Sequence, residues 1–163
     1  MKRADIIRRL EKQGWKVAKR SGRSLRLPIE VVVRYPKLPP TLTEFLGGLS
    51  SCENQTQTAW FLCEADYDGT SGAAFRWDEW ERISLEAAED DAGLVDAVRE
   101  FWNEHLPFLL SVRDGYAYFA VRTAADGFGQ VVTGCEPEFE EVSPVAGTFE
   151  EFLSLLADGS VQA

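Results

Sequence analysis

Two short apolar runs separated by an Asp-Gly pair constrain this chain more than any other feature. Residues 107–112 form the first run, residues 116–121 form the second, and Asp114-Gly115 lies between them. Asp-Gly between apolar runs predicts a β-hairpin with a type I′ turn, because that turn needs a positive φ angle at both central residues. The sequence therefore predicts an antiparallel strand pair near the middle of the carboxyl-terminal half.

A third strand, an acidic loop and a helix are expected to follow this hairpin. Asp126-Gly127 leads into residues 130–133, which we expect to be the third strand. After an acidic stretch, Thr148 and Glu151 fit a capping box, in which the hydroxyl and the carboxylate each accept a hydrogen bond from a free N–H group. The apolar residues behind this cap share one face of a helix: Phe149, Phe152, Leu153 and Leu156.

Three further helices are predicted from apolar side chains at helical spacing. Residues 3–13 carry a narrow apolar stripe between basic residues. Residues 41–49 begin with Thr41 and Glu44, which fit a second capping box. Residues 94–102 place their apolar side chains on one side of a helix.

The stretch between the first two helices is harder to interpret. Residues 15–19 and 24–27 are expected to form a ragged hairpin around Ser21-Gly22, although their basic side chains also suit an extended basic arm. Residues 29–35 are rich in β-branched side chains, which favours a strand. A short helical turn at the same place stays open as the alternative.

The middle of the chain is expected to contain strands and polar loops. Residues 58–63 are rich in β-formers and predict a buried strand. Residues 51–57 are expected to be a polar loop, residues 64–72 a turn-rich acidic loop and residues 73–77 a strand. The acidic residues 86–91 are expected either to begin a helix or to form a loop.

Length and composition favour one α+β domain. A chain of 163 residues falls in the usual size range of a single domain. We therefore expect one domain over residues 1–163, with a mainly antiparallel sheet of five or six strands and about four helices. No apolar run approaches the roughly 18 residues of a membrane span, and the amino terminus lacks the apolar core of a secretory signal. The odd number of cysteines, three, indicates reduced thiols and a cytoplasmic location.

Charge is distributed unevenly along the chain. Residues 1–37 hold twelve Lys or Arg and three Asp or Glu, whereas residues 38–163 hold five and twenty-four. The acidic part is suited to attracting a basic protein by long-range electrostatics. The basic part could contact nucleic acid or anionic lipid, or it could pack against the acidic part of its own domain.

The sequence contains no recognisable catalytic or cofactor motif. Glu64, Asp66 and Asp68 alternate like calcium ligands, but Ser71 and Trp77 occupy positions where an EF-hand loop requires Gly and Glu. Phosphate-loop and GxSxG motifs are absent, and one histidine with no CxxC pair makes a zinc site improbable. We therefore predict no enzymatic activity, no metal and no cofactor. The single histidine, His105, is expected to interact with a helix carboxyl terminus or to be a polar residue in the core.

The remaining candidate site combines acidic and aromatic residues in expected loops and strand edges. Aromatic side chains contribute most of the affinity of many interfaces, and charges increase the association rate. This composition predicts a site for a basic protein partner, with no membrane and no direct nucleic-acid contact, although the aromatic residues could instead belong to the core. The candidate partner-binding residues are Asp66, Tyr67, Asp68, Trp77, Asp78, Glu79, Trp80, Tyr116, Glu136, Glu138 and Glu140.

Several of these segments also carry a resemblance to a known family. The chain resembles the SUKH superfamily, which includes the fungal cell-wall assembly regulator and many bacterial immunity proteins. The resemblance extends over about residues 25–157, and the segments that carry it are Leu38-Pro39 with its helix to Leu49, Trp60-Phe61-Leu62, Phe101-Trp102, Leu106-Pro107, residues 114–118, residues 129–132 and residues 143–153.

The resemblance implies both a fold and a role. The fold is α+β, a single domain with a curved, mainly antiparallel sheet packed against helices. The role in bacteria is that of an immunity protein, which binds and neutralises a cognate toxin, often a nuclease. The alternative is a regulatory scaffold closer to the fungal branch, with no toxin partner.

Overall fold

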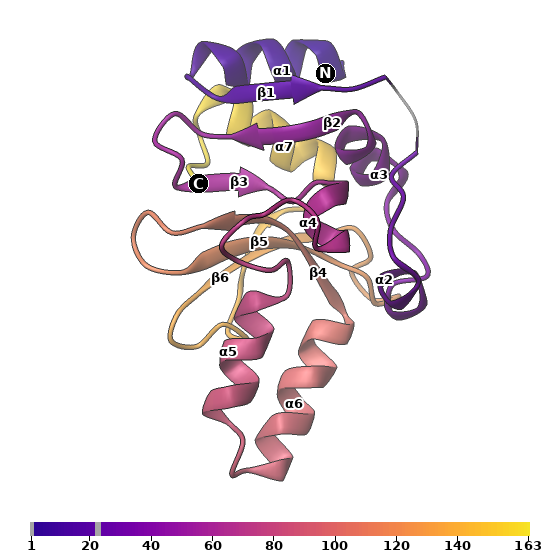
Figure 1. Cartoon of the computed structure of the whole chain (residues 1–163), viewed down its shortest axis with the longest axis vertical. Helices are drawn as coiled ribbons and strands as arrows, with labels where there is room; N and C mark the ends of the chain where they lie inside the picture. Colours follow the sequence, from indigo (N-terminus) through magenta and orange to yellow (C-terminus); the bar gives the residue numbers. More distant parts are fainter. Residues whose placement is uncertain (1, 22–23) are drawn as a thin grey trace.

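The chain forms one α+β domain around a seven-stranded antiparallel sheet. The structure is a computed structural model that describes residues 2–21 and 24–163. The sheet is open, and its strands follow one another in the order of the sequence (Figure 1). The strands are β1 (Lys16–Lys19), β2 (Leu49–Glu53), β3 (Ala59–Phe61), β4 (His105–Ser111), β5 (Ala117–Arg122), β6 (Val131–Cys135) and β7 (Ser143–Ala146).

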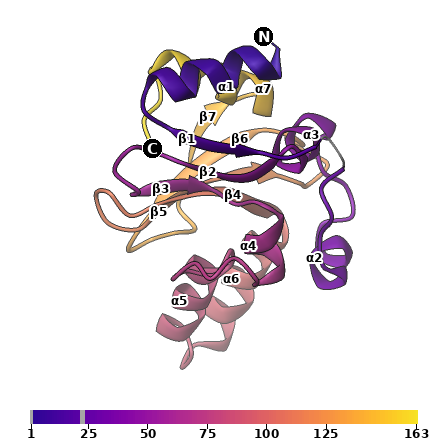
Figure 2. The ribbon, with the colours of Figure 1, turned by 45° about the horizontal axis from the view of Figure 1, so that its top comes forward.

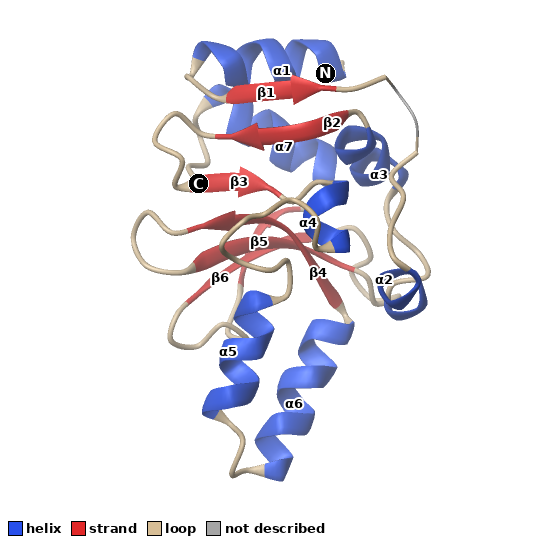
Figure 3. Cartoon of the chain, in the orientation of Figure 1, coloured by secondary structure: helices blue, strands red, loops and turns tan. Residues whose placement is uncertain are grey.

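Seven helices lie around this sheet within the described residues (Figure 3). Helices α5 and α6 form an antiparallel hairpin that extends away from the sheet (Figure 3). The helices are α1 (Arg3–Lys12), α2 (Ile29–Arg34), α3 (Pro40–Gly47), α4 (Glu64–Asp68), α5 (Glu79–Ala87), α6 (Ala92–Asn103) and α7 (Phe149–Asp158). None of the helices in residues 2–21 and 24–163 is long and apolar enough to cross a membrane.

The core lies on both faces of β4, whose seven residues are all buried. On one face, the Phe108 ring packs edge-on against Phe149 and Phe152 of α7, at 5.1 Å from each ring centre. On the other face, Trp102 of α6 packs against Tyr118 of β5 at 4.9 Å. Figure 2 shows the sheet between α1 and α7 on one side and α4, α5 and α6 on the other.

The predictions with the strongest local signals are confirmed. Helices α1, α3, α6 and α7 occur where apolar periodicity predicts them, and β4, β5 and β6 follow the predicted order. Thr148 caps α7 by accepting a hydrogen bond from the Glu151 N–H, while the Glu151 carboxylate accepts one from Gly147 N–H. The segment at residues 29–35, for which a strand and a helical turn were both open, forms the short helix α2.

Several weaker predictions are wrong. Residues 24–27 form no strand, and β1 pairs instead with β2, which occupies part of the expected polar loop at residues 51–57. Gly22, in the expected hairpin turn, lies outside the described residues. Residues 73–77 are irregular rather than a strand, and residues 64–68 form the helix α4. The capping box expected at Thr41 is absent, because the N-cap residue of α3 is Pro39 and Thr41 lies inside the helix. Strand β7 was not predicted.

The predicted hairpin turn is present, but its type differs from type I′. Gly115 has a φ angle of +90°, whereas among the described non-glycine residues only Gln57 has a positive φ. Asp114 therefore lacks the positive φ angle that a type I′ turn requires at its first central position. The connection between β4 and β5 spans the five residues 112–116.

Gly115 provides the first testable prediction. We expect Gly115→Val to lower the free energy of unfolding by about 1 kcal/mol or more, because a β-branched residue is strained at positive φ. Gly115→Asn is the matched control and should cost less, since Asn adopts this conformation more readily. Urea denaturation of the three proteins measures the difference, and equal stability of the Val variant and the unaltered protein would contradict the prediction.

Candidate functional site

The candidate site is built around α2, a six-residue helix between Pro28 and Tyr35. Pro28 precedes the first helical residue with a φ angle of −56°, and it cannot donate a backbone hydrogen bond. Val31 and Tyr35 are the buried side chains of this segment, with 1% and 2% of their surface exposed. These two side chains fix α2 against the domain, so that Ile29, Val32 and Val33 face outward.

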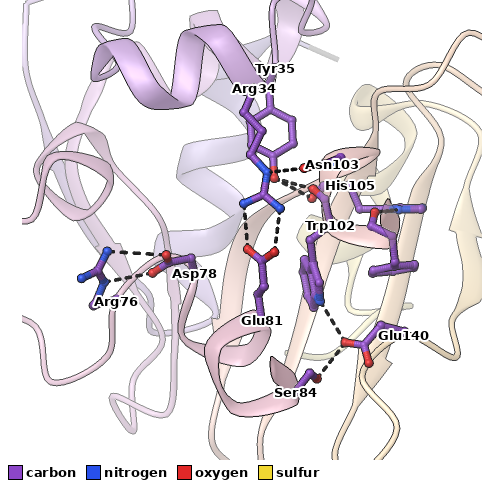
Figure 4. A network of polar contacts seen from close by, with 11 residues as sticks. Arg34, Tyr35, Arg76, Asp78, Glu81, Ser84, Trp102, Asn103, His105 and Glu140 are labelled. Carbon is purple, nitrogen blue, oxygen red and sulfur yellow. Dashed lines mark hydrogen bonds and ion pairs between the residues drawn. The ribbon is translucent and has the colours of Figure 1, made fainter. Parts of the chain in front are cut away.

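A buried ion pair joins α2 to the helical hairpin (Figure 4). Both terminal guanidinium nitrogens of Arg34 donate to the Glu81 carboxylate, at 2.7 and 2.6 Å. The Arg34 Nε donates to Asn103 Oδ1 at 2.9 Å, so one side chain contacts both α5 and α6. Two parallel charge-assisted bonds hold the planar guanidinium in one orientation. The Glu81 side chain is only 8% exposed and that of Arg34 is 21% exposed.

Tyr35 extends this connection to the start of β4. Its hydroxyl donates to the carbonyl oxygens of Trp102 and His105, at 2.5 and 3.3 Å. Burial raises the pKa of Tyr35 well above its ordinary value, so the phenol stays protonated. Its ring lies edge-on to Trp77, with the ring centres 6.3 Å apart.

A pocket opens where α2, α4 and residues 69–78 meet, and we call it the α2–α4 pocket. Its volume is about 480 Å³. Five of the eleven candidate partner-binding residues line it, although they come from two separate segments of the chain. These are Asp66, Tyr67, Asp68, Trp77 and Asp78, and the other lining residues are Glu30, Arg34, Gly69, Ser71, Gly72, Ala73, Phe75 and Arg76.

The α2–α4 pocket carries more acidic than basic charge. Asp78 pairs with Arg76 at 3.0 Å, and Arg34 is neutralised by Glu81. Asp66 accepts a hydrogen bond from the Cys63 N–H at the start of α4. Within the described residues, Glu30, Asp66 and Asp68 form no ion pair. Asp68 accepts hydrogen bonds from the N–H and the hydroxyl of Thr70. The pocket lining therefore includes three carboxylates whose charge no cation of the described residues neutralises.

Two of the four aromatic candidates are core residues. Tyr67 is 3% exposed and donates from its hydroxyl to Pro107 O at 2.7 Å, and Trp80 is 1% exposed. Trp80 stacks on Tyr116, with the ring centres 4.5 Å apart. A partner can therefore contact Trp77 and Tyr116, which are half-buried, but not Tyr67 or Trp80 without displacing them.

The acidic candidates after β6 lie away from the α2–α4 pocket. Glu140 accepts hydrogen bonds from Ser84 Oγ and Trp102 Nε1, both at 2.8 Å, and so connects its loop to the hairpin. Glu136 and Glu138 are exposed. Glu79, at the start of α5, pairs with Arg82 at 3.6 Å.

A further group of acidic residues was not among the candidates. They lie on the α5–α6 hairpin, where the sequence showed an acidic stretch without a clear structure. The periodicity of α6 was visible in the sequence, but the position of its acids on a protruding hairpin was not. The exposed acidic residues of this hairpin are Glu86, Glu89, Asp90, Asp91, Asp96 and Glu100.

The two buried thiols, Cys52 and Cys63, and the histidine are held in their neutral forms. Burial raises the pKa of Cys63 to about 12, and burial also raises that of Cys52. A thiol with a raised pKa is a poor nucleophile at neutral pH. His105 is 4% exposed, contacts Phe101 O through Nδ1 at 2.8 Å, and stacks on the Phe101 ring. In residues 2–21 and 24–163, no cluster of three His, Cys, Asp or Glu side chains is arranged to hold a metal ion.

His105 gives a prediction about pH. Burial, together with the nearby Arg122, lowers the pKa of His105 below its ordinary value of 6.5. The unfolded chain therefore binds the proton at a higher pH than the folded chain does. As a result, the free energy of unfolding should fall as the pH decreases from 6.5 toward the folded-state pKa. Because this is the only histidine, a proton NMR titration of its imidazole reports the value directly. A midpoint at or above 6.5 would contradict the prediction.

Comparison of the chain with protein-family models, with characterised proteins and with solved structures finds no match.

Proposed function

We propose that this protein is a non-enzymatic binding module for a basic protein, and that it acts as an immunity protein that neutralises a cognate toxin. The resemblance to the SUKH superfamily supports the immunity role. The separation of charge in the structure supports a basic partner. The acidic α5–α6 hairpin is the observation that carries the proposal.

The α5–α6 hairpin and the segment that forms α1 and β1 lie at opposite ends of the molecule (Figure 1), and their charges differ in sign. The hairpin, residues 79–103, contains eight acidic and two basic residues. Residues 3–19, which form α1 and β1 at the other end, contain six basic and two acidic residues. The apolar face of α1 is buried, but Arg8, Arg9 and Lys12 are exposed to solvent. The helix therefore packs on its own domain without neutralising the acidic end.

This charge distribution favours one orientation of an approaching partner. A basic protein is attracted to the hairpin and repelled from α1, so encounters at the hairpin become more frequent. Electrostatic attraction of this kind acts mainly on the association rate and is weakened by salt. Fast association suits an inhibitor that must occupy its target before the target acts.

A charge-matched pair of variants tests the role of the hairpin. The native partner is first captured from source cell lysate. We expect Glu86→Gln/Glu89→Gln/Asp90→Asn to lower its association rate about tenfold at low salt. The control is Glu11→Gln/Glu44→Gln/Glu150→Gln, which removes three exposed acids at the other end of the molecule. Surface plasmon resonance at several salt concentrations measures both rates. Equal losses in the two variants would mean that net charge alone, rather than the hairpin, attracts the partner.

A further inference from the structure

The outward face of α2 is unusually apolar for an exposed helix. Five large apolar side chains are exposed in the described part of the chain, and three of them lie on α2. Ile29, Val32 and Val33 are 73%, 43% and 71% exposed. β-Branched residues have lower helix propensity than most other residues. The stability of α2 therefore does not explain why Ile and Val occupy these exposed positions.

This apolar face lies beside the α2–α4 pocket. Ile29 and Val33 are four residues apart and form one row along the helix, while Glu30 and Arg34 form the adjacent row. Glu30 and Arg34 line the pocket. A chain segment that covers Ile29 and Val33 is therefore within reach of the carboxylates in the pocket.

Charge determines what kind of segment fits both features. Arg34 and Arg76 are already paired with Glu81 and Asp78, whereas Glu30, Asp66 and Asp68 have no cation within the described residues. The pocket is thus complementary to a positive charge, and the α2 face is complementary to apolar side chains. Trp77, which is half-buried, also lines the pocket, and an aromatic ring attracts a guanidinium group.

We propose that α2 and the α2–α4 pocket form one docking surface for a partner segment in which an arginine or lysine lies between apolar residues. The cation enters the pocket, and the flanking apolar side chains cover Ile29 and Val33. The identification of this segment as part of a protein partner rests on the proposed function. The rigidity of the surface follows from the buried Val31 and the Arg34–Glu81 ion pair.

Preorganisation supports this use of α2. The stiff side chains of Ile29, Val32 and Val33 have few rotamers to lose when a partner covers them. Exposed apolar residues on a fixed helix therefore gain more from burial than the same residues on a mobile loop would.

The test uses blocked tripeptides and the full ¹⁵N-labelled chain. The probe is acetyl-Leu-Arg-Val-amide, and the two comparison peptides replace Arg with uncharged citrulline or replace both apolar residues with Gly. We expect the probe to shift the amide signals of α2 and residues 66–78, and each comparison peptide to bind at least about fivefold more weakly. Equal binding of the three peptides, or shifts confined to other elements, would overturn the proposal.

Two variants complete the test. Ile29→Ser/Val33→Ser should weaken binding of the probe peptide at least about fivefold. The melting temperature should not change, because both side chains are exposed. Leu94→Ser is the control, since Leu94 is 49% exposed on α6, outside the α2–α4 pocket. Self-association of the protein that the double variant abolishes would show that a second copy covers α2, and this would also overturn the proposal. If the peptides do not bind but a basic protein still binds at the α5–α6 hairpin, the docking surface is wrong and the proposed function stands.

Discussion

Glu81→Gln is expected to lower the free energy of unfolding by about 3 kcal/mol, because it leaves the Arg34 guanidinium largely buried without its counter-charge. Glu81 accepts hydrogen bonds from both terminal nitrogens of Arg34, and the Glu81 side chain is 8% exposed. Gln can accept only one of these hydrogen bonds and carries no charge. Urea denaturation of the variant and the unaltered protein measures the loss.

Asp5→Asn is the matched control for this ion pair. Asp5 pairs with Arg8 at 2.8 Å, but the two side chains are 42% and 64% exposed, so the loss should stay below about 1 kcal/mol. The double variant Arg34→Met/Glu81→Met should recover most of the stability, because apolar replacement removes both buried charges together. A Glu81→Gln variant as stable as Asp5→Asn would mean that the ion pair does not hold α2 in place.

Gly134→Ala is expected to lower the free energy of unfolding by about 2 kcal/mol through overpacking. A Cβ atom at Gly134 would lie 2.7 Å from the Phe139 carbonyl oxygen and 2.7 Å from the Tyr118 hydroxyl oxygen. Those two groups are hydrogen-bonded to each other and buried. The added methyl group must therefore displace either the Tyr118 ring or the backbone of the acidic loop that follows β6.

Gly93→Ala provides the comparison for Gly134. Gly93 lies in α6, and a Cβ atom there would meet only Asp91 Oδ1, at 3.5 Å. Replacing this helical glycine should leave stability unchanged or raise it by up to about 1 kcal/mol. Thermal denaturation of both variants gives the comparison, and a stable Gly134→Ala protein would contradict the close packing beneath the acidic loop.

Local signals allowed part of the fold to be predicted. Helix α7 follows from four apolar residues at helical spacing and a Thr148 cap, which all lie within one short segment. The β4–β5 pair follows from two apolar runs and one glycine. In both cases the residues that determine the structure are neighbours in the sequence.

The missed elements lack a local sequence signal of this kind. β1 pairs with β2, for example through Val17 and Cys52, and no local pattern distinguishes that pairing from a hairpin at Ser21. β7 contains Pro144 and pairs with β6 at the edge of the sheet, where a proline is tolerated. These strands are determined by pairing with a neighbouring strand rather than by a pattern in their own sequence.

For the candidate site, too, some features were visible in the sequence and others depend on the fold. The acidic and aromatic composition was visible in the sequence, and five of the candidate residues share the α2–α4 pocket. The contribution of Glu30 and Arg34 to that pocket could not be predicted, because α2 and α4 are distant in the sequence and only the fold brings them to one pocket. The burial of Tyr67 and Trp80 likewise depends on the sheet behind them.

Capture of the native partner from source cell lysate, at low and at moderate salt and with identification by mass spectrometry, tests the central claim most directly. The account predicts one basic protein that is retained at low salt and lost as the salt concentration rises, because screening weakens its attraction to the acidic hairpin. Retention of a partner that is acidic, or that resists the rise in salt, would contradict the proposed function.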